Sequence, residues 1–168
     1  MENIENVTAF IKEKIVANGG DPLRETLTVV KTTDGRNYYR YADGNAYRVY
    51  RFIDETKTVE NDKTLDDLYN AGIGFGRFQR MLDDFPVEKL HETIKDFHNT
   101  PKRFETFLKA VEENKSGRAH LVQDEINFIL ERKAVTDSLI DLLNAGEIPL
   151  KVTHNDTKLS NILMDAKT

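Results

Sequence analysis

The stretch Val152-Thr-His-Asn-Asp-Thr-Lys-Leu-Ser-Asn161 is the most informative part of this 168-residue chain. It brings His154, Asp156, Lys158 and Asn161 together in one short polar segment. Apolar runs flank the segment at residues 148–152 and 162–164, and they predict two short strands with a loop between them. The sequence therefore predicts a functional loop, with a polar turn of a β-hairpin as the structural alternative.

The residue types in this loop are those that phosphoryl transfer requires. In that reaction the protein mainly positions an acceptor hydroxyl, a metal ion and the phosphates. Asp156 is suited to orient the hydroxyl and take its proton, and the amide oxygen of Asn161 is suited to Mg²⁺. Lys158 lies between them as a mobile positive charge that can reach a transferring phosphoryl group. We expect His154 to brace the loop rather than to react.

The amino-acid sequence also resembles that of a known family. Residues 153–165 are similar, almost letter for letter, to the catalytic loop of the aminoglycoside phosphotransferase and choline kinase superfamily. Within that superfamily the resemblance is closest to the N-acetylhexosamine 1-kinase type of sugar kinase. Residues 46–53, 75–79 and 92–104 resemble it too. Asn155 stands where protein kinases carry an arginine that receives an activation-loop phosphate, which favours a small-molecule acceptor over a protein.

The resemblance implies an ATP- and Mg²⁺-dependent kinase that phosphorylates a sugar hydroxyl. Its catalytic residues would be Asp156 and Lys158, with Asn161 on the metal and His154 supporting the loop. Arg51, Phe52 and Ile53 would lie at an interlobe hinge, where backbone groups meet the adenine ring. The acceptor stays open, with choline, homoserine or an aminoglycoside as alternatives. A non-catalytic, kinase-like interaction module is the alternative from another functional class.

The expected architecture is α+β and protein-kinase-like, with a small antiparallel-sheet lobe (1–56) and a mostly helical lobe (57–168). In the first lobe we expect a helix through Val7, Phe10, Ile11 and Ile15 that stops at Gly19-Gly20, since these apolar residues recur at helical spacing. A three-stranded meander should follow over residues 26–32, 37–41 and 46–53, because Asp34-Gly35 and Asp43-Gly44 are typical of tight turns. In the second lobe we expect helices at 65–82, 86–94, 102–113 and 118–144.

Both lobes look incomplete when they are set against the family. Its members carry a phosphate-covering loop before the first helix and an acidic metal-binding motif after the catalytic loop, and this sequence has neither. We therefore expect the middle portion of a longer enzyme, with little turnover of its own and with self-association through exposed apolar surface. Asp165 lies close to Asn161, but the family places its second metal-binding aspartate further downstream.

Two other features of the sequence are interpreted as structural and not as functional. Gly72-Ile-Gly-Phe-Gly76 has the glycines of a phosphate loop, but no strand precedes it and the helical periodicity continues through it. His91 and His98 lack a ligand cluster of recognisable spacing, so we expect surface histidines there.

Composition limits the partners and the compartment. The net charge of −5 argues against broad electrostatic capture of nucleic acid or anionic membrane. The chain has no cysteine, which excludes thiol catalysis and thiolate metal sites. It also has no apolar stretch of bilayer length and no recognisable secretory leader, so we expect a cytoplasmic protein.

Overall fold

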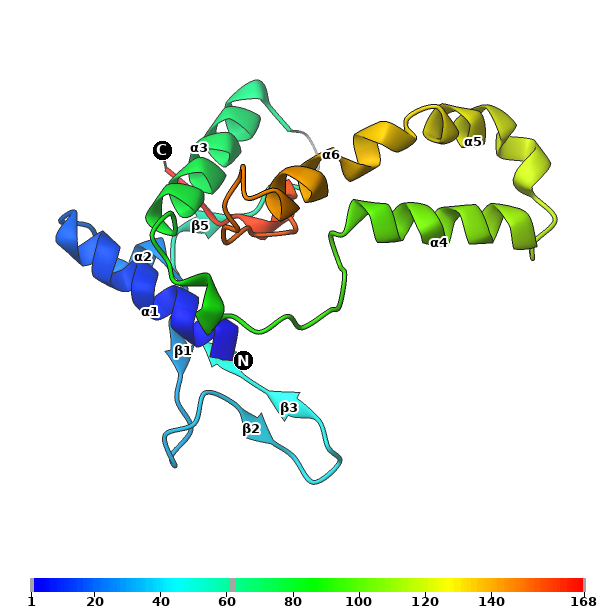
Figure 1. Ribbon diagram of the computed structural model, residues 1–168. Coiled ribbons are helices and arrows are strands. Elements are labelled where there is room, and N and C mark those ends of the chain that lie inside the picture. The colour runs from blue at the N-terminus through cyan, green and yellow to red at the C-terminus, as the bar shows by residue number, and fades with distance from the viewer. Residues whose placement is uncertain (1, 61–62, 168) are drawn as a thin grey trace. The chain divides into compact units, whose positions relative to one another are not determined.

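The computed structural model describes residues 2–60 and 63–167 and has an α+β fold, with six α-helices and small antiparallel sheets in this part of the chain (Figure 1). The described residues divide into two compact units. The first combines residues 2–60, 63–91 and 151–167, and the second comprises residues 92–150. The expected boundary after residue 56 falls inside the first unit, so contacts group the chain differently from 1–56 and 57–168.

Helix α1 (Glu2–Ala17) supplies two of the four buried residues that form the core cluster of the first unit. Ile11 and Ile15 lie on one face of the helix and pack with Leu82 and Phe85. The helix ends just before the glycines that predicted its end. Gly19 adopts a φ of 74°, and the amide of Gly20 donates to the carbonyl of Ile15. The helix predicted from Val7, Phe10, Ile11 and Ile15 is therefore confirmed.

The predicted three-stranded meander is wrong in its pairing. Strand β1 (Val29–Val30) pairs antiparallel with β4 (Val49–Tyr50), and β2 (Tyr39–Arg40) pairs with β3 (Ala46–Tyr47). The third predicted segment therefore serves both partners, and the first and second do not pair with each other. The reason is local: residues 32–36 close a turn of their own, in which the amide of Thr32 donates to the carbonyl of Arg36. This turn projects as a side loop from one interrupted hairpin.

The turn at residues 32–36 places two hydrogen-bond donors on the carboxylate of Asp34, and their effect on its pKa can be measured. Hydrogen bonds from the side chains of Arg36 and Thr32 lower the pKa of Asp34 from 3.8 to about 2. A depressed carboxyl pKa contributes stability that is present above the ordinary value and is lost as the pH falls from about 3.8 through about 2. We expect carbonyl ¹³C NMR to show Asp34 titrating near pH 2, and Arg36→Gln to shift it upward. If Asp34 in the unaltered chain titrated near pH 3.8, this would contradict the hydrogen bonds assigned to its carboxylate.

Helix α3 (Leu65–Met81) forms where its periodicity predicts. Thr64 and Asp67 make a capping box at its start, in which each side chain accepts from the other residue's backbone amide. The segment Gly72–Gly76 is helical, as its periodicity predicted. Gly74 lies against Ile162, with about 3.6 Å between the isoleucine side chain and the position of an added Cβ. An alanine Cβ at this position would make only an ordinary van der Waals contact with Ile162, in the segment that follows the predicted loop.

The segments around the predicted loop are less regular than expected. Only a short 3₁₀ turn, η1 (Val87–Lys89), forms in the helix predicted at 86–94, because Asn3 bonds to both the amide and the carbonyl of His91 and holds the chain extended. Residues 148–152 form no strand. There Lys151 bonds to Asp83, and Val152 packs against the core.

One short pair of strands ties the end of the chain to residues just after the expected hinge. Strand β5 (Thr56–Lys57) pairs antiparallel with β6 (Met164–Asp165), and the amide of Ala166 donates to the carbonyl of Glu55. The last three residues of the predicted loop form a 3₁₀ turn, η3 (Leu159–Asn161).

The second unit is helical. It contains α4 (Thr100–Glu113), η2 (Ala119–Val122), α5 (Gln123–Leu130) and α6 (Lys133–Asn144), with Phe104 and Ile126 buried. The single helix predicted over 118–144 is wrong, since it breaks between α5 and α6. At the break the Arg132 side chain folds back, donates to the carbonyl of Phe128 and lies over its ring. Among the described residues, no helix combines the length and apolar character needed to cross a bilayer.

Candidate functional site

The loop from Thr153 to Asn161 is anchored by His154. The imidazole lies in edge-to-face contact with Phe75 and Phe78 of α3, with ring centroids 5.3 and 5.6 Å apart. On its other side, Nδ1 of His154 accepts a long hydrogen bond of 3.4 Å from the amide of Asp156. These contacts fit the bracing role expected for His154. Sequence reasoning placed Phe75 and Phe78 on the helix but missed their contact with the histidine, although an i, i+3 aromatic pair marks one helix face.

Asn155 turns the backbone between the bracing histidine and the candidate base. Its φ is 63°, in the left-handed region that asparagine and glycine tolerate better than other residues. The hydroxyl of Thr153 donates to its side-chain oxygen over 2.5 Å. The backbone at this position therefore gives a conformational reason for asparagine, separate from the kind of substrate that the residue favours.

The conformational demand at residue 155 can be isolated with two substitutions. Asn155→Gly and Asn155→Ala both remove the acceptor of the Thr153 hydroxyl, but only alanine places a Cβ at a φ of 63°. We expect the alanine variant to be less stable than the glycine variant by about 1 kcal/mol. Urea unfolding followed by tyrosine fluorescence measures the difference, since all six tyrosines lie between residues 38 and 69 of the same unit. Equal stabilities would refute the left-handed assignment.

Asp156, Lys158 and Asn161 are brought together by the loop. The side-chain nitrogen of Asn161 donates to the backbone carbonyl of Asp156 over 2.9 Å and to its carboxylate over 2.7 Å. Lys158 Nζ lies 3.7 Å from the same carboxylate. The side chains of Asp156 and Lys158 are 60% and 62% exposed, so a dissolved substrate has access to both. The predicted trio is thus one cluster of a carboxylate, a cation and an amide.

The donor chemistry of this cluster fits a hard metal ion. Because the Asn161 nitrogen is directed to Asp156, its oxygen is the atom of that amide with the character of a metal ligand. An amide oxygen of this kind is a hard donor that suits Mg²⁺. Three or more His, Asp or Glu side chains do not converge on a metal-sized site anywhere in residues 2–60 and 63–167.

The expected hinge residues lie in the same unit as the loop. The amide of Arg51 donates to the carbonyl of Thr28, which extends the β1–β4 pairing by one bond. Phe52 follows with 80% of its side chain exposed, and the carbonyl of Ile53 accepts from the hydroxyl of Thr56. The Phe52 ring is therefore exposed, while the amide of Arg51 and the carbonyl of Ile53 are already bonded within the chain, and β5 begins three residues after Ile53.

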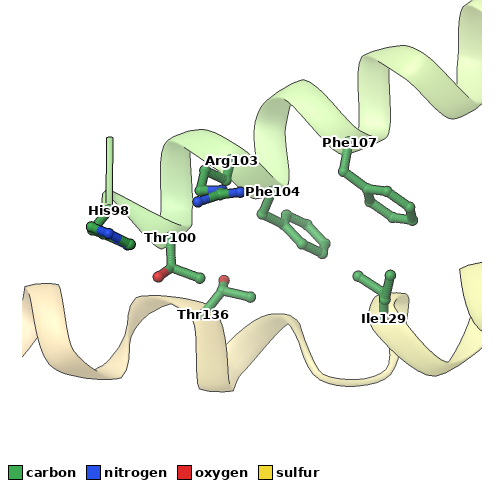
Figure 2. Close-up of a pocket in the computed structure, with 7 residues that line it drawn as sticks. All are labelled: His98, Thr100, Arg103, Phe104, Phe107, Ile129 and Thr136. Carbon is green, nitrogen blue, oxygen red and sulfur yellow. The ribbon is translucent and has the colours of Figure 1, made fainter. Parts of the chain in front are cut away.

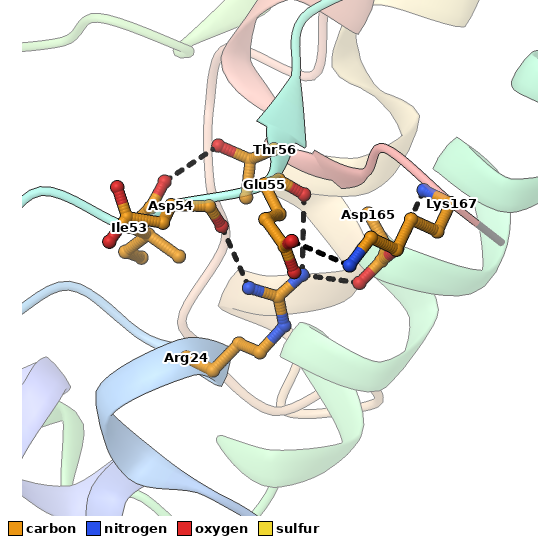
Figure 3. Close-up of polar contacts among 7 residues, drawn as sticks. All are labelled: Arg24, Ile53, Asp54, Glu55, Thr56, Asp165 and Lys167. Atoms are coloured by element: carbon orange, nitrogen blue, oxygen red, sulfur yellow. Dashed lines mark hydrogen bonds and ion pairs between the residues drawn. The ribbon is translucent and has the colours of Figure 1, made fainter.

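Asp165 is bonded to residues outside the catalytic-loop segment. Its carboxylate forms an ion pair with Arg24 and also accepts from the amide of Lys167 over 2.8 Å (Figure 3). Arg24 belongs to the short helix α2 (Pro22–Glu25), and sequence reasoning missed it. No local pattern marks it, because its partner Asp165 is 141 positions away.

A pocket of about 360 Å³ lies in the second unit, between α4 on one side and α5 and α6 on the other (Figure 2). Phe104, Phe107 and Ile129 form its apolar part, and His98, Thr100, Arg103 and Thr136 lie at its other end. None of the residues singled out from the catalytic-loop pattern line it. Arg103 is already directed to the carbonyl of Phe97, so the pocket offers a ligand chiefly apolar surface.

No protein-family model matches this chain.

Proposed function

We propose that this chain belongs to an ATP- and Mg²⁺-dependent phosphotransferase that acts on a hydroxyl of a small molecule, with an N-acetylhexosamine-type sugar as the favoured acceptor. The observation that carries the proposal is the pair of bonds from the Asn161 amide to Asp156. They hold a carboxylate and an amide oxygen at one exposed place, with Lys158 beside them.

The residues have distinct tasks in this reaction. Asp156 orients the acceptor hydroxyl and takes its proton while the hydroxyl oxygen bonds to the γ-phosphorus and the bond to the ADP oxygen breaks. Lys158 offsets negative charge on the phosphoryl oxygens. Asn161 would hold the metal through its amide oxygen, and its nitrogen donates to Asp156 and fixes that carboxylate. Bound Mg²⁺ supplies charge neutralisation at the phosphates.

Two features support a small acceptor. The loop carries Asn155 where a protein kinase would carry arginine, and the left-handed backbone at that position disfavours arginine. The choice of an N-acetylhexosamine over choline, homoserine or an aminoglycoside rests on the resemblance of residues 153–165 and of the three further segments.

The direct test has a binding arm and a transfer arm. Calorimetry should detect binding of MgATP to the chain, and EDTA should weaken that binding. In the transfer arm, the chain is held in excess over γ-labelled ATP, so that even slow transfer is seen. N-acetylglucosamine, N-acetylgalactosamine, choline, homoserine and an aminoglycoside are then compared as acceptors. We expect label on an amino sugar. Absence of both MgATP binding and acceptor labelling would refute the proposal and favour a non-catalytic module.

A further inference from the structure

The guanidinium of Arg24 contacts two segments that are far from it in the sequence, residues 54–55 and Asp165. Its Nη1 donates to the carbonyl of Asp54 over 2.8 Å, and its Nη2 donates to the carbonyl of Glu55 over 3.3 Å. Nη2 also pairs with the carboxylate of Asp165, which raises the pKa of Arg24 (Figure 3). A planar fork with several donors suits such simultaneous contacts, whereas a lysine ammonium has a single head.

Residue Glu55 has an unusual backbone conformation and contacts three residues that are distant in the sequence. Its φ is 54°, a conformation that side-chain-bearing residues adopt rarely and that the surroundings must maintain. Its carbonyl accepts from Arg24 and from the amide of Ala166, and its carboxylate pairs with Lys167 over 2.5 Å. Every one of these partners lies either on α2 or directly after the candidate catalytic loop.

The carboxylate of Asp165 completes the connection. It lies opposite Thr56 in the β5–β6 pair, and its other oxygen accepts from the amide of Lys167. The side chains of Arg24 and Asp165 are only 38% and 35% exposed, so their ion pair is partly shielded from solvent. A segment immediately after the expected hinge is therefore bonded to the strand that leaves the candidate catalytic loop.

We propose that Arg24 is a positioning residue for the nucleotide: it holds residues 53–57 against residues 164–167, and so fixes the expected adenine-binding segment relative to the loop that carries Asp156 and Asn161. This inference rests on the proposed function. It gives Asp165 a structural task, as the acidic partner of Arg24, instead of a place among the metal ligands.

The first arm of the test measures the connection itself. Hydrogen exchange at the Ala166 amide reports the β5–β6 edge, because that amide donates to Glu55. We expect Arg24→Gln to speed this exchange by about tenfold, and Arg24→Lys to speed it less because the ion pair with Asp165 is kept. Arg36→Gln is the matched control, since it also removes an arginine from an Arg–Asp pair of the same unit. Exchange that is no faster in Arg24→Gln than in Arg36→Gln overturns the inference.

The second arm measures MgATP affinity at a temperature where circular dichroism shows every variant to be folded, so that a loss of overall stability does not register. We expect Arg24→Gln to raise the dissociation constant about fivefold to tenfold, with partial rescue in Arg24→Lys and no change in Arg36→Gln. If the unaltered chain binds MgATP and Arg24→Gln binds it with the same affinity, the positioning role alone is overturned. A lack of MgATP binding by the unaltered chain overturns the positioning role, and together with a lack of acceptor labelling it overturns the proposed function as well.

Discussion

Replacing Asp156 by asparagine is expected to slow phosphoryl transfer to the acceptor by about 10²- to 10⁴-fold, the usual range for loss of a general base. Asparagine keeps an oxygen that can accept the bond from the Asn161 amide, so the loop should retain its shape. The neutral amide does not take a proton from the acceptor hydroxyl. The rate is measured under single-turnover conditions with γ-labelled ATP and the acceptor that becomes labelled in the transfer comparison.

The same substitution should leave MgATP affinity nearly unchanged, because Asp156 acts on the acceptor side of the reaction. Asp66→Asn is the matched control, since Asp66 is another exposed aspartate of the same unit, in the first turn of α3. It should transfer phosphate at the unaltered rate. A transfer rate for Asp156→Asn within about threefold of the unaltered chain would show that Asp156 is not the base.

The candidate site could be predicted from the sequence as far as its contacts are local. His154, Asp156, Lys158 and Asn161 lie within one turn-rich segment, so their spacing alone brings them together. Arg24 could not be found in this way. Its contacts reach Asp54 across 30 positions and Asp165 across 141, and such contacts depend on how the chain folds back rather than on any periodic pattern.

The same distinction explains the errors in the fold. Helices α1, α3 and α4 follow from apolar spacing with a cap or a glycine stop, which are local signals. The interrupted hairpin could not be predicted in the same way, because β1 pairs with β4 and not with β2. Strand pairing is a non-local property, and the two turn sequences did not determine it. The break before α6 has no proline or glycine to announce it, and its visible cause is the Arg132 side chain folding onto Phe128.

The core of the first unit extends to the candidate site through a short series of contacts. Leu82 packs with Ile11, Ile15 and Phe85, and Phe78 and Val152 lie against this cluster. Phe78 also contacts the ring of His154, and Val152 directly precedes the loop. The position of the loop therefore depends on a small apolar core, in which one lost side chain leaves few others to fill the space.

Leu82→Ala is accordingly expected to destabilise the first unit by about 2–5 kcal/mol, since Leu82 is only 1% exposed and its removal leaves a cavity. Urea unfolding followed by tyrosine fluorescence measures the effect. Leu65→Ala is the matched control on α3, because Leu65 is 84% exposed and its loss should change stability by no more than about 0.5 kcal/mol. If the two variants differed by less than about 1 kcal/mol, the cluster around Leu82 would not be the core that supports the loop.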